Sequence, residues 1–194
     1  MIIIGITGNI GSGKTTVSNF LKKSMYVFNS DDYVKELSKS KKIINIILQQ
    51  FPKAKSSNGG LDIPKLREII FSNYRVNIKT LEDIYHPYVL KKINSIIFIN
   101  KLFRKKFIAL EVPLLFETGL NKVCHKIIVT ICSAETQKAR VLAREGMNER
   151  MLTEIMKKQG NIKYKMKLAN YIINTDEDLA TIENNVNKII ESLS

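Results

Sequence analysis

The sequence predicts an α/β fold of three layers, with a five-stranded parallel sheet between helices. Two observations support this prediction. Short apolar runs, which are typical of buried strands, alternate with longer amphipathic stretches, which are typical of helices. The first apolar run, at residues 2–6, also leads directly into a glycine-rich segment and then into an amphipathic stretch. Such a strand–loop–helix order, repeated with crossovers, builds a parallel sheet covered on both faces.

The predicted elements follow from this periodicity in chain order. We expect strands after the first at residues 26–28, 107–112, 125–131 and 171–173. We expect helices at residues 14–23, 33–51, 64–71, 78–103, 133–145, 149–159 and 176–192, the fourth of them interrupted at His86-Pro87 because proline lacks a backbone donor.

Length and composition are those of an ordinary globular protein. The chain has 194 residues, of which 44% are hydrophobic and 25% charged, which is enough for one α/β core and an inserted subdomain. No apolar run approaches the roughly 20 residues that a membrane helix needs. The apolar N-terminus has no basic flank, so we expect no signal peptide, no membrane partner and a cytoplasmic location.

The net charge of +13 would suit a nucleic-acid partner. The excess is mostly Lys, however, and it is scattered along the chain, so we expect no nucleic-acid partner and favour a phosphate-rich substrate or a compositional bias. Cys124 and Cys132 flank a predicted strand, which would hold them too far apart for a disulfide, so we expect both to be reduced.

The glycine-rich segment reads Gly8-x-x-x-x-Gly13-Lys14-Thr15, the spacing of a phosphate-binding loop. Glycines let successive N–H groups turn inward, the following helix adds its positive end, and Lys14 would reach the β- and γ-phosphates. The Thr15 hydroxyl would ligate Mg²⁺ as the metal-binding residue. The alternative is a turn that is merely rich in glycine. The predicted ATP-binding residues are Gly8, Gly11, Ser12, Gly13, Lys14, Thr15 and Thr16.

Polar side chains follow the predicted strands at 26–28 and 107–112. Ligands of open parallel sheets bind at the carboxyl ends of the strands, so Asp31, in Asn29-Ser-Asp-Asp32, is a candidate base. The alternative is that Ser30 or Asp31 only caps the next helix.

Arg140 and Arg144 lie four residues apart and are expected on one face of a helix, near the phosphate loop. We therefore predict a helical lid that carries both arginines, at the residues 140–160 that the family resemblance described below implies, although a solvated helix face is the alternative. The nucleotide-binding core is assigned to 1–32, 86–139 and 161–194, and a helical insertion to 33–85.

Together these features indicate phosphoryl transfer to a small molecule. A GTPase switch would need Asn-Lys-x-Asp, and the nearest segment, Ile173-Asn-Thr-Asp176, lacks the Lys. A nucleic-acid-stimulated ATPase, the other class considered, would need a basic face and usually a longer chain.

Several segments together resemble the dephospho-CoA kinase family, over nearly the whole chain. They are Ile6–Thr16, Val27–Asp31, Leu66-Arg-Glu-Ile-Ile-Phe71, His86-Pro87, Val112-Pro-Leu-Leu-Phe-Glu117, Thr136–Gly146, Gln159 and Ala169–Asn174. The phosphate loop alone would fit many kinases, whereas the set is specific.

The resemblance implies a transferase of coenzyme A biosynthesis that uses ATP and Mg²⁺ to phosphorylate the ribose 3′-hydroxyl of dephospho-CoA, with 33–85 as the CoA-binding insertion. It implies Lys14, Asp31, Arg140 and Arg144 as catalytic residues. The substrate-binding residues that it implies are Asp31, Arg67, His86, Pro113, Leu114 and Glu117. A kinase of another small acceptor, such as a nucleoside monophosphate, is the alternative. A monomer is favoured.

The sequence departs from the family pattern at four positions. Asn29, Asn170 and Asn174 stand where the family usually has Asp, and Glu111 stands where Asp is common. An amide at position 29 cannot supply charge, so any metal or base role of that position is not expected here.

Overall fold

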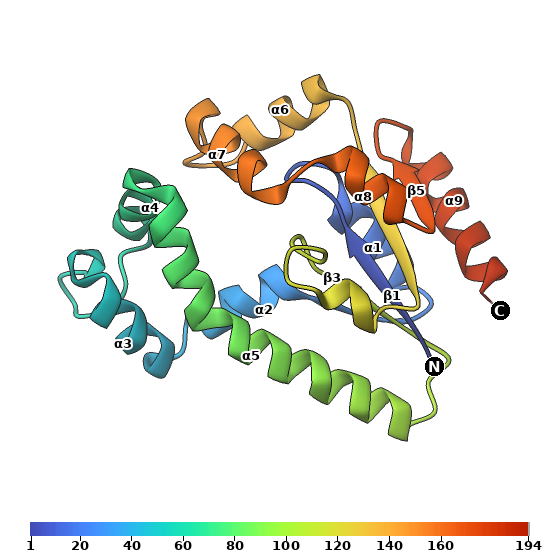
Figure 1. Cartoon of the computed structure of the whole chain (residues 1–194), viewed down its shortest axis with the longest axis horizontal. Helices are drawn as coiled ribbons and strands as arrows, with labels where there is room; N and C mark the ends of the chain where they lie inside the picture. The colour runs from blue at the N-terminus through green and yellow to red at the C-terminus, as the bar shows by residue number, and fades with distance from the viewer. Residues whose placement is uncertain (194) are drawn as a thin grey trace. The chain divides into compact units, whose positions relative to one another are not determined.

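The computed structural model of the chain describes residues 1–193. The last residue of the predicted core segment 161–194, Ser194, lies outside the described residues. The chain forms two compact units (Figure 1). The first comprises Met1–Asn29 and Ile97–Ser194, and the second comprises Ser30–Ile96.

The first unit is built on a five-stranded sheet in the order β2-β3-β1-β4-β5, with every neighbouring pair parallel. This confirms the predicted fold class. Because all strands run the same way, the segments that follow them emerge at one edge of the sheet. The strands are β1 (Ile2–Thr7), β2 (Tyr26–Asn29), β3 (Phe107–Glu111), β4 (Lys126–Ile131) and β5 (Tyr171–Asn174).

Helices α1 and α9 pack on the sheet because each buries an apolar face on it. Val17 and Leu21 of α1, with Ile182 and Val186 of α9, are buried in one cluster with side chains of the central strands, such as Ile4. The helices of this unit are α1 (Lys14–Leu21), α6 (Ala134–Leu142), α7 (Glu149–Gln159), α8 (Ile162–Leu168) and α9 (Leu179–Ser192), with a 3₁₀ turn η2 (Leu120–Val123).

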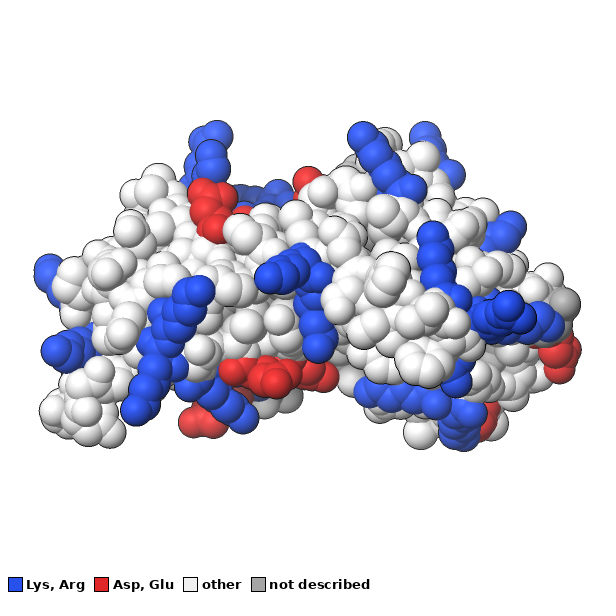
Figure 2. Space-filling view, turned by 90° about the horizontal axis from the view of Figure 1, so that it is seen from below, with Lys and Arg blue, Asp and Glu red and all other residues white. Residues whose placement is uncertain are grey.

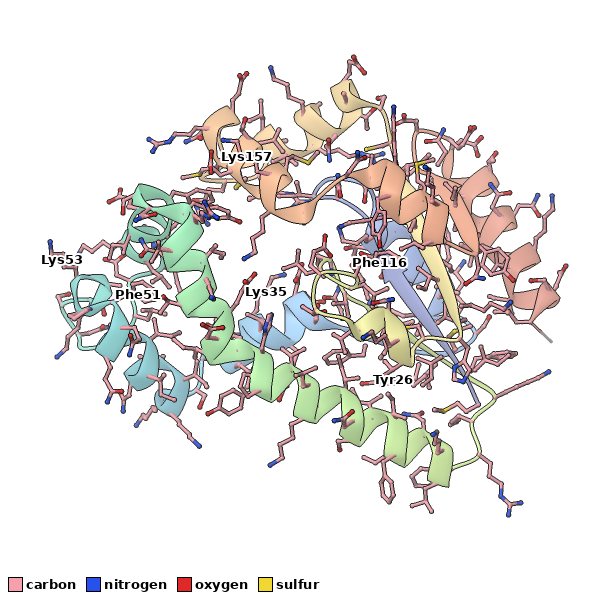
Figure 3. All side chains as sticks on the ribbon, in the orientation of Figure 1. Tyr26, Lys35, Phe51, Lys53, Phe116 and Lys157 are labelled. Carbon is pink, nitrogen blue, oxygen red and sulfur yellow. The ribbon has the colours of Figure 1, made fainter. Side chains whose placement is uncertain are left out.

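The second unit is helical and has an apolar core of its own. That core includes Ile43, Ile47, Leu66, Ile70 and Phe51, the last of which is labelled in Figure 3. Its elements are α2 (Ser30–Leu37), α3 (Lys41–Gln50), the 3₁₀ turn η1 (Pro52–Ala54), α4 (Ile63–Ser72) and most of α5 (Tyr74–Leu102).

The helix predicted at 33–51 is two helices, because the chain turns at residues 38–40. The Ser38 hydroxyl donates to the Val34 carbonyl and lies 2.5 Å from the Tyr85 hydroxyl, while Ser40 has the extended backbone of an N-cap. Serine competes with the helix for backbone hydrogen bonds in this way.

The predicted interruption at His86-Pro87 is wrong, since α5 continues through Pro87. Proline removes a backbone donor, and the buried side chains on either side of it, Tyr85, Val89 and Ile93, hold the helix in place. Tertiary packing thus outweighs a local helix-breaking signal.

Helix α8 was not predicted, because its sequence, Ile-Lys-Tyr-Lys-Met-Lys-Leu, alternates apolar and charged residues with a period of two, whereas a helix favours a spacing of three to four. It is capped by Asn161, whose side chain accepts the Lys163 N–H at 2.8 Å, and it packs on β4.

The structure bears on three expectations about charge, cysteines and membrane helices. On the face in Figure 2, Lys and Arg side chains are separated by uncharged surface and by acidic groups, rather than joined in one basic band. Cys124 and Cys132 are both free, as expected. Within residues 1–193, no helix is long and apolar enough to cross a membrane.

Candidate functional site

The phosphate-binding sequence forms the loop between β1 and α1, as predicted from its spacing. Gly11 and Gly13 have φ of +78° and +77°, in the left-handed region that favours glycine. A Cβ on Gly13 would also lie 2.6–2.8 Å from side-chain atoms of Thr175. Glycine is therefore required there by both conformation and space.

Lys14, the first residue of α1, is buried, and its ammonium group donates to the carbonyl oxygens of Gly8 at 2.9 Å and Asn9 at 3.0 Å. The N-cap of α1 is Gly13, which has no side chain to occupy the first N–H groups of the helix. The loop thus combines a cation with a helix N-terminus, which is the arrangement that attracts phosphate.

A buried carboxylate lies beside the predicted metal ligand. Glu111, the last residue of β3, is 3% exposed. It accepts from the Thr15 hydroxyl at 3.3 Å through Oε1 and from the Asn29 amide at 2.8 Å through Oε2. A hydroxyl and a carboxylate are hard oxygen donors that suit Mg²⁺, and substrate phosphate can complete its coordination.

Our sequence reasoning noted Glu111 only as a replacement for Asp and did not count it among the site residues. Residues 1–193 contain no group of three or more His, Cys, Asp or Glu that could hold a metal by itself. The sequence does show an acidic residue at the end of a strand. That residue points to the site only once the strand order is known, because β3 lies next to β1 in the sheet.

The rest of the loop is fixed by the ends of β4 and β5. The Ser12 hydroxyl lies 2.7 Å from that of Thr130, and the Thr175 hydroxyl donates to the Ser12 carbonyl at 3.1 Å. The Arg140 guanidinium donates to Thr175 at 2.7 and 2.8 Å and to the Gly11 carbonyl at 3.3 Å. Arg140 therefore lies against the phosphate loop.

The expectation that Arg140 and Arg144 share a helical face is wrong. Helix α6 ends at Leu142, and the exposed Arg144 lies in the turn after it, with its N–H on the Val141 carbonyl at 3.1 Å. The chain must turn here because Gly146 is left-handed, with φ of +70°, and Asn148 caps α7. Spacing of four residues places side chains together only where the helix continues.

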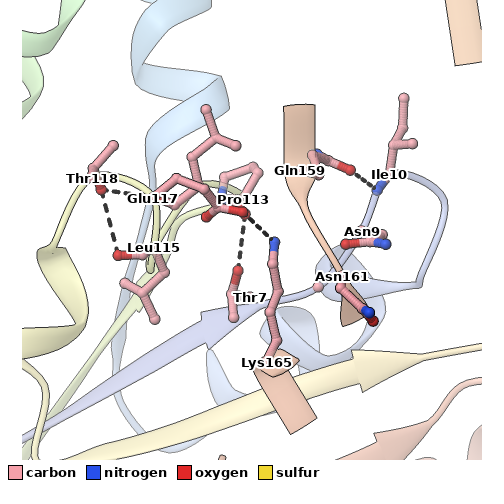
Figure 4. Close-up of polar contacts among 12 residues, drawn as sticks. Thr7, Asn9, Ile10, Pro113, Leu115, Glu117, Thr118, Gln159, Asn161 and Lys165 are labelled. Atoms are coloured by element: carbon pink, nitrogen blue, oxygen red, sulfur yellow. Dashed lines mark hydrogen bonds and ion pairs between the residues drawn. The ribbon is translucent and has the colours of Figure 1, made fainter. Parts of the chain in front are cut away.

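The turn after β3 is joined to its neighbours by polar contacts (Figure 4). The Thr7 hydroxyl donates to the Pro113 carbonyl at 3.0 Å, and the Leu114 carbonyl accepts from Thr118 at 2.7 Å. Glu117 pairs with Lys165 of α8 at 2.8 Å, and the Lys165 side chain is only 2% exposed. Lys165 was missed by our sequence reasoning, because α8 itself was not predicted.

The other three predicted site residues, Asp31, Arg67 and His86, belong to the second unit. Asp31 is exposed in the first turn of α2, and Arg67 of α4 and His86 of α5 are half-buried. Asp31 follows Asn29 by two residues, so covalent geometry alone keeps the two Cα atoms within about 7 Å.

Two titratable groups at the carboxyl ends of β4 and β5 have shifted pKa values. The Ser133 N–H donates to the Asp176 carboxylate at 2.6 Å, which lowers the pKa of Asp176. Burial raises the pKa of Cys132, although Arg140 opposes the shift, so this residue is a thiol at neutral pH.

The chain matches known proteins over nearly its full length. The dephospho-CoA kinase family model matches residues 2–181. A curated protein of Bartonella quintana, "Dephospho-CoA kinase", is 38% identical over 194 residues, covering 100% of this chain and 98% of that protein.

Solved structures agree on the fold. The crystal structure of TT1252 from Thermus thermophilus has a TM-score of 0.76 at 30% identity and covers 100% of this chain and 98% of its own. Shikimate kinase from Acinetobacter baumannii, at 18% identity and a TM-score of 0.54, covers 100% of this chain and 93% of its own and shares the fold. The phosphate loop, the parallel sheet and the match over nearly the full length lead to one conclusion: this chain belongs to the dephospho-CoA kinase family.

Proposed function

We propose that this protein transfers the γ-phosphoryl group of ATP to the ribose 3′-hydroxyl of dephospho-CoA, giving coenzyme A and ADP. The observation that carries the proposal is the phosphate loop together with the buried Lys14 and the Thr15–Glu111 pair. The family match supplies the acceptor. No finding favours the alternative of a nucleoside monophosphate acceptor.

On the donor side, residues Gly8–Thr16 would hold the phosphates through backbone N–H groups. Lys14 would exchange its contacts with the Gly8 and Asn9 carbonyls for contacts with phosphate oxygens. Thr15 and Glu111 would hold the Mg²⁺ ion. When bound, such an ion neutralises charge on the transferring group.

Asp31 is the proposed base, which accepts the proton of the 3′-hydroxyl as its oxygen bonds to the γ-phosphorus and the bond to ADP breaks. Its position two residues after Asn29, which contacts Glu111, supports this role. Asn29 is a hydrogen-bond donor here, so it orients Glu111 rather than adding a second carboxylate.

Arg140 and Arg144 are proposed to stabilise the charge of the transferred group, with 140–160 as a lid that excludes water. Residues 33–85 are the proposed acceptor-binding insertion. Within the acceptor site we propose Arg67, His86, Pro113, Leu114 and Glu117 as binding residues. Glu117 is already paired with Lys165, so the proposed role of Glu117 is to position the turn that carries Pro113 and Leu114.

The proposal is tested by measuring ADP release with ATP, Mg²⁺ and one acceptor at a time. The acceptors are dephospho-CoA, adenosine, AMP, CMP and shikimate. We expect turnover with dephospho-CoA alone, and a product phosphorylated at the 3′ position. Turnover only with AMP or CMP would reject the proposal, as would ADP release that does not depend on any acceptor.

A further inference from the structure

Ile10 lies in the middle of the phosphate loop, and side-chain amides hold both polar groups of its backbone. Its N–H donates to Gln159 Oε1 at 2.6 Å, and its carbonyl accepts from Gln137 Nε2 at 2.7 Å. The first of these contacts is drawn in Figure 4. The two glutamines come from different helices, Gln137 from α6 and Gln159 from the end of α7.

The chemistry of the two contacts is complementary. Gln159 must present an acceptor and Gln137 a donor, and a neutral amide is the side chain that can do either. The Gln137 amide also donates to the Met156 sulfur of α7 at 3.3 Å. Both helices are therefore joined to the same residue of the loop, Ile10.

Gln159 is held in place from both sides. It is 7% exposed and is the last residue of α7. Gly160 then turns the chain, with φ of +68°, and α8 begins at once and packs on β4. A buried glutamine left without its partner would cost free energy, so this contact fixes the peptide group that joins Asn9 to Ile10.

The loop also lies directly against α6. A Cβ on Gly11 would come within 2.9 Å of Val141 Cγ2 and 3.0 Å of the Gln137 carbonyl. The Ile10 N–H belongs to the peptide group that joins Asn9 to Ile10, and the Ile10 carbonyl belongs to the next one, which joins Ile10 to Gly11. Both consecutive peptide groups are therefore held, and neither can rotate without breaking a hydrogen bond.

We infer that Gln137 and Gln159 are positioning residues that clamp the two peptide groups flanking Ile10 and so preorganise the phosphate loop for ATP. Neither touches the reacting atoms. They set the direction of the backbone amides that follow Ile10, which lowers the cost of ordering the loop when phosphate binds. The inference rests on the proposed function, because it takes this loop to be the ATP site.

The first test is nucleotide affinity. Gln159→Leu removes the acceptor at similar size and leaves the Ile10 N–H unpaired, so we expect the Kd for ADP and the KM for ATP to rise roughly tenfold. The KM for dephospho-CoA should stay near its wild-type value. A general loss of structure would instead change both KM values together.

The second test is amide hydrogen exchange at Ile10 without nucleotide, measured by NMR on the full chain. The wild-type N–H should be protected, Gln159→Leu should lose that protection, and Gln159→Glu should keep it because a carboxylate still accepts. This readout does not depend on the protein being a kinase.

Three variants complete the design. Gln137→Met removes the other half of the clamp and serves if Gln159→Leu fails to fold; it too should weaken ADP binding. Met156→Leu keeps the α6–α7 packing without the sulfur acceptor and should bind ADP normally. Gln50→Leu, at an exposed helix end, is the matched control for the substitution itself.

The outcomes separate the two hypotheses. If wild-type protein binds no ADP and transfers no phosphate, the proposed function fails, and the exchange result alone still decides whether the clamp exists. If wild-type protein is an active kinase and either clamp variant binds ADP as tightly as wild type, the inference is overturned. Unchanged Ile10 exchange in Gln159→Leu overturns it as well.

Discussion

The proposed site draws on two regions that differ in burial. In the first unit, Lys14, Glu111 and Lys165 are buried and each contacts another part of that unit. In the second unit, Asp31 is exposed at the start of α2, and Arg67 and His86 are half-buried. We therefore expect substitutions at these buried residues to lower stability, whereas a substitution at the exposed Asp31 should change the chemistry with little effect on stability.

The largest effect on turnover is expected for Asp31→Asn, which tests the difference between exposed and buried residues. Turnover should fall by about 10²–10⁴-fold, because the amide cannot accept the proton, while ADP affinity and melting temperature stay near wild type. Steady-state kinetics, calorimetric titration with ADP and thermal unfolding measure the three quantities.

Asp32→Asn is the matched control, since Asp32 lies in the same helical turn and pairs with Lys35 at the surface at 3.0 Å. It should keep nearly full turnover. Equal losses in both variants would mean that the first turn of α2 needs negative charge rather than a base at position 31.

The next effect is expected at the Glu117–Lys165 pair. Glu117→Gln leaves the buried Lys165 ammonium without its counter-charge and should lower the free energy of unfolding by roughly 2–3 kcal/mol. Lys165→Met removes the buried charge itself and leaves only the partly exposed Glu117, so it should cost less, about 1 kcal/mol.

Urea unfolding of both variants measures this asymmetry. Glu154→Gln, which breaks the surface pair with Lys157, is the control and should cost under about 0.5 kcal/mol. If Lys165→Met lowered the free energy of unfolding more than Glu117→Gln, the pair with Glu117 would not explain why a lysine is buried at position 165.

A smaller effect should separate the two arginines. Arg140→Ala removes hydrogen bonds to Thr175 and Gly11, and we expect a loss of about 1–2 kcal/mol in the free energy of unfolding. Arg144→Ala should leave stability within about 0.5 kcal/mol of wild type, because this side chain is exposed.

In kinetic assays, Arg144→Ala should lower turnover more than it weakens dephospho-CoA binding, as expected of a group that acts on the transferred phosphoryl. Wild-type turnover in that variant would make Arg144 a surface charge. A stability loss equal to that of Arg140→Ala would show that exposure does not separate the two residues.

The smallest effect concerns Asp176, an exposed carboxylate in the first unit. The Ser133 N–H lowers its pKa in the folded state, so its contribution to stability is present above the unfolded pKa of about 3.9 and is lost as pH falls through the folded value. Asp176→Asn should therefore lower the melting temperature slightly at pH 7, and the difference should vanish in acid. A difference that grows with acidity would reverse this assignment.

By itself the sequence determined the strands, the parallel order of elements and the phosphate loop. These are encoded locally: apolar runs bury themselves, and Gly11 and Gly13 are needed for their own backbone conformation. The glycine-rich segment after β1 and the acidic segment after β2 could be found from the sequence for the same reason, because each directly follows a strand in the chain.

The tertiary structure alone decided what those segments touch. Glu111 beside Thr15, Lys165 beside Glu117 and the two glutamines on Ile10 join residues about 50 to 150 positions apart, and no local pattern encodes such pairs. The same holds where local signals misled: packing carried α5 through Pro87, and a turn required by the start of α7 removed Arg144 from its expected helix. A local conformational preference is worth only about 1–3 kcal/mol of free energy, so the burial of surrounding side chains can outweigh it.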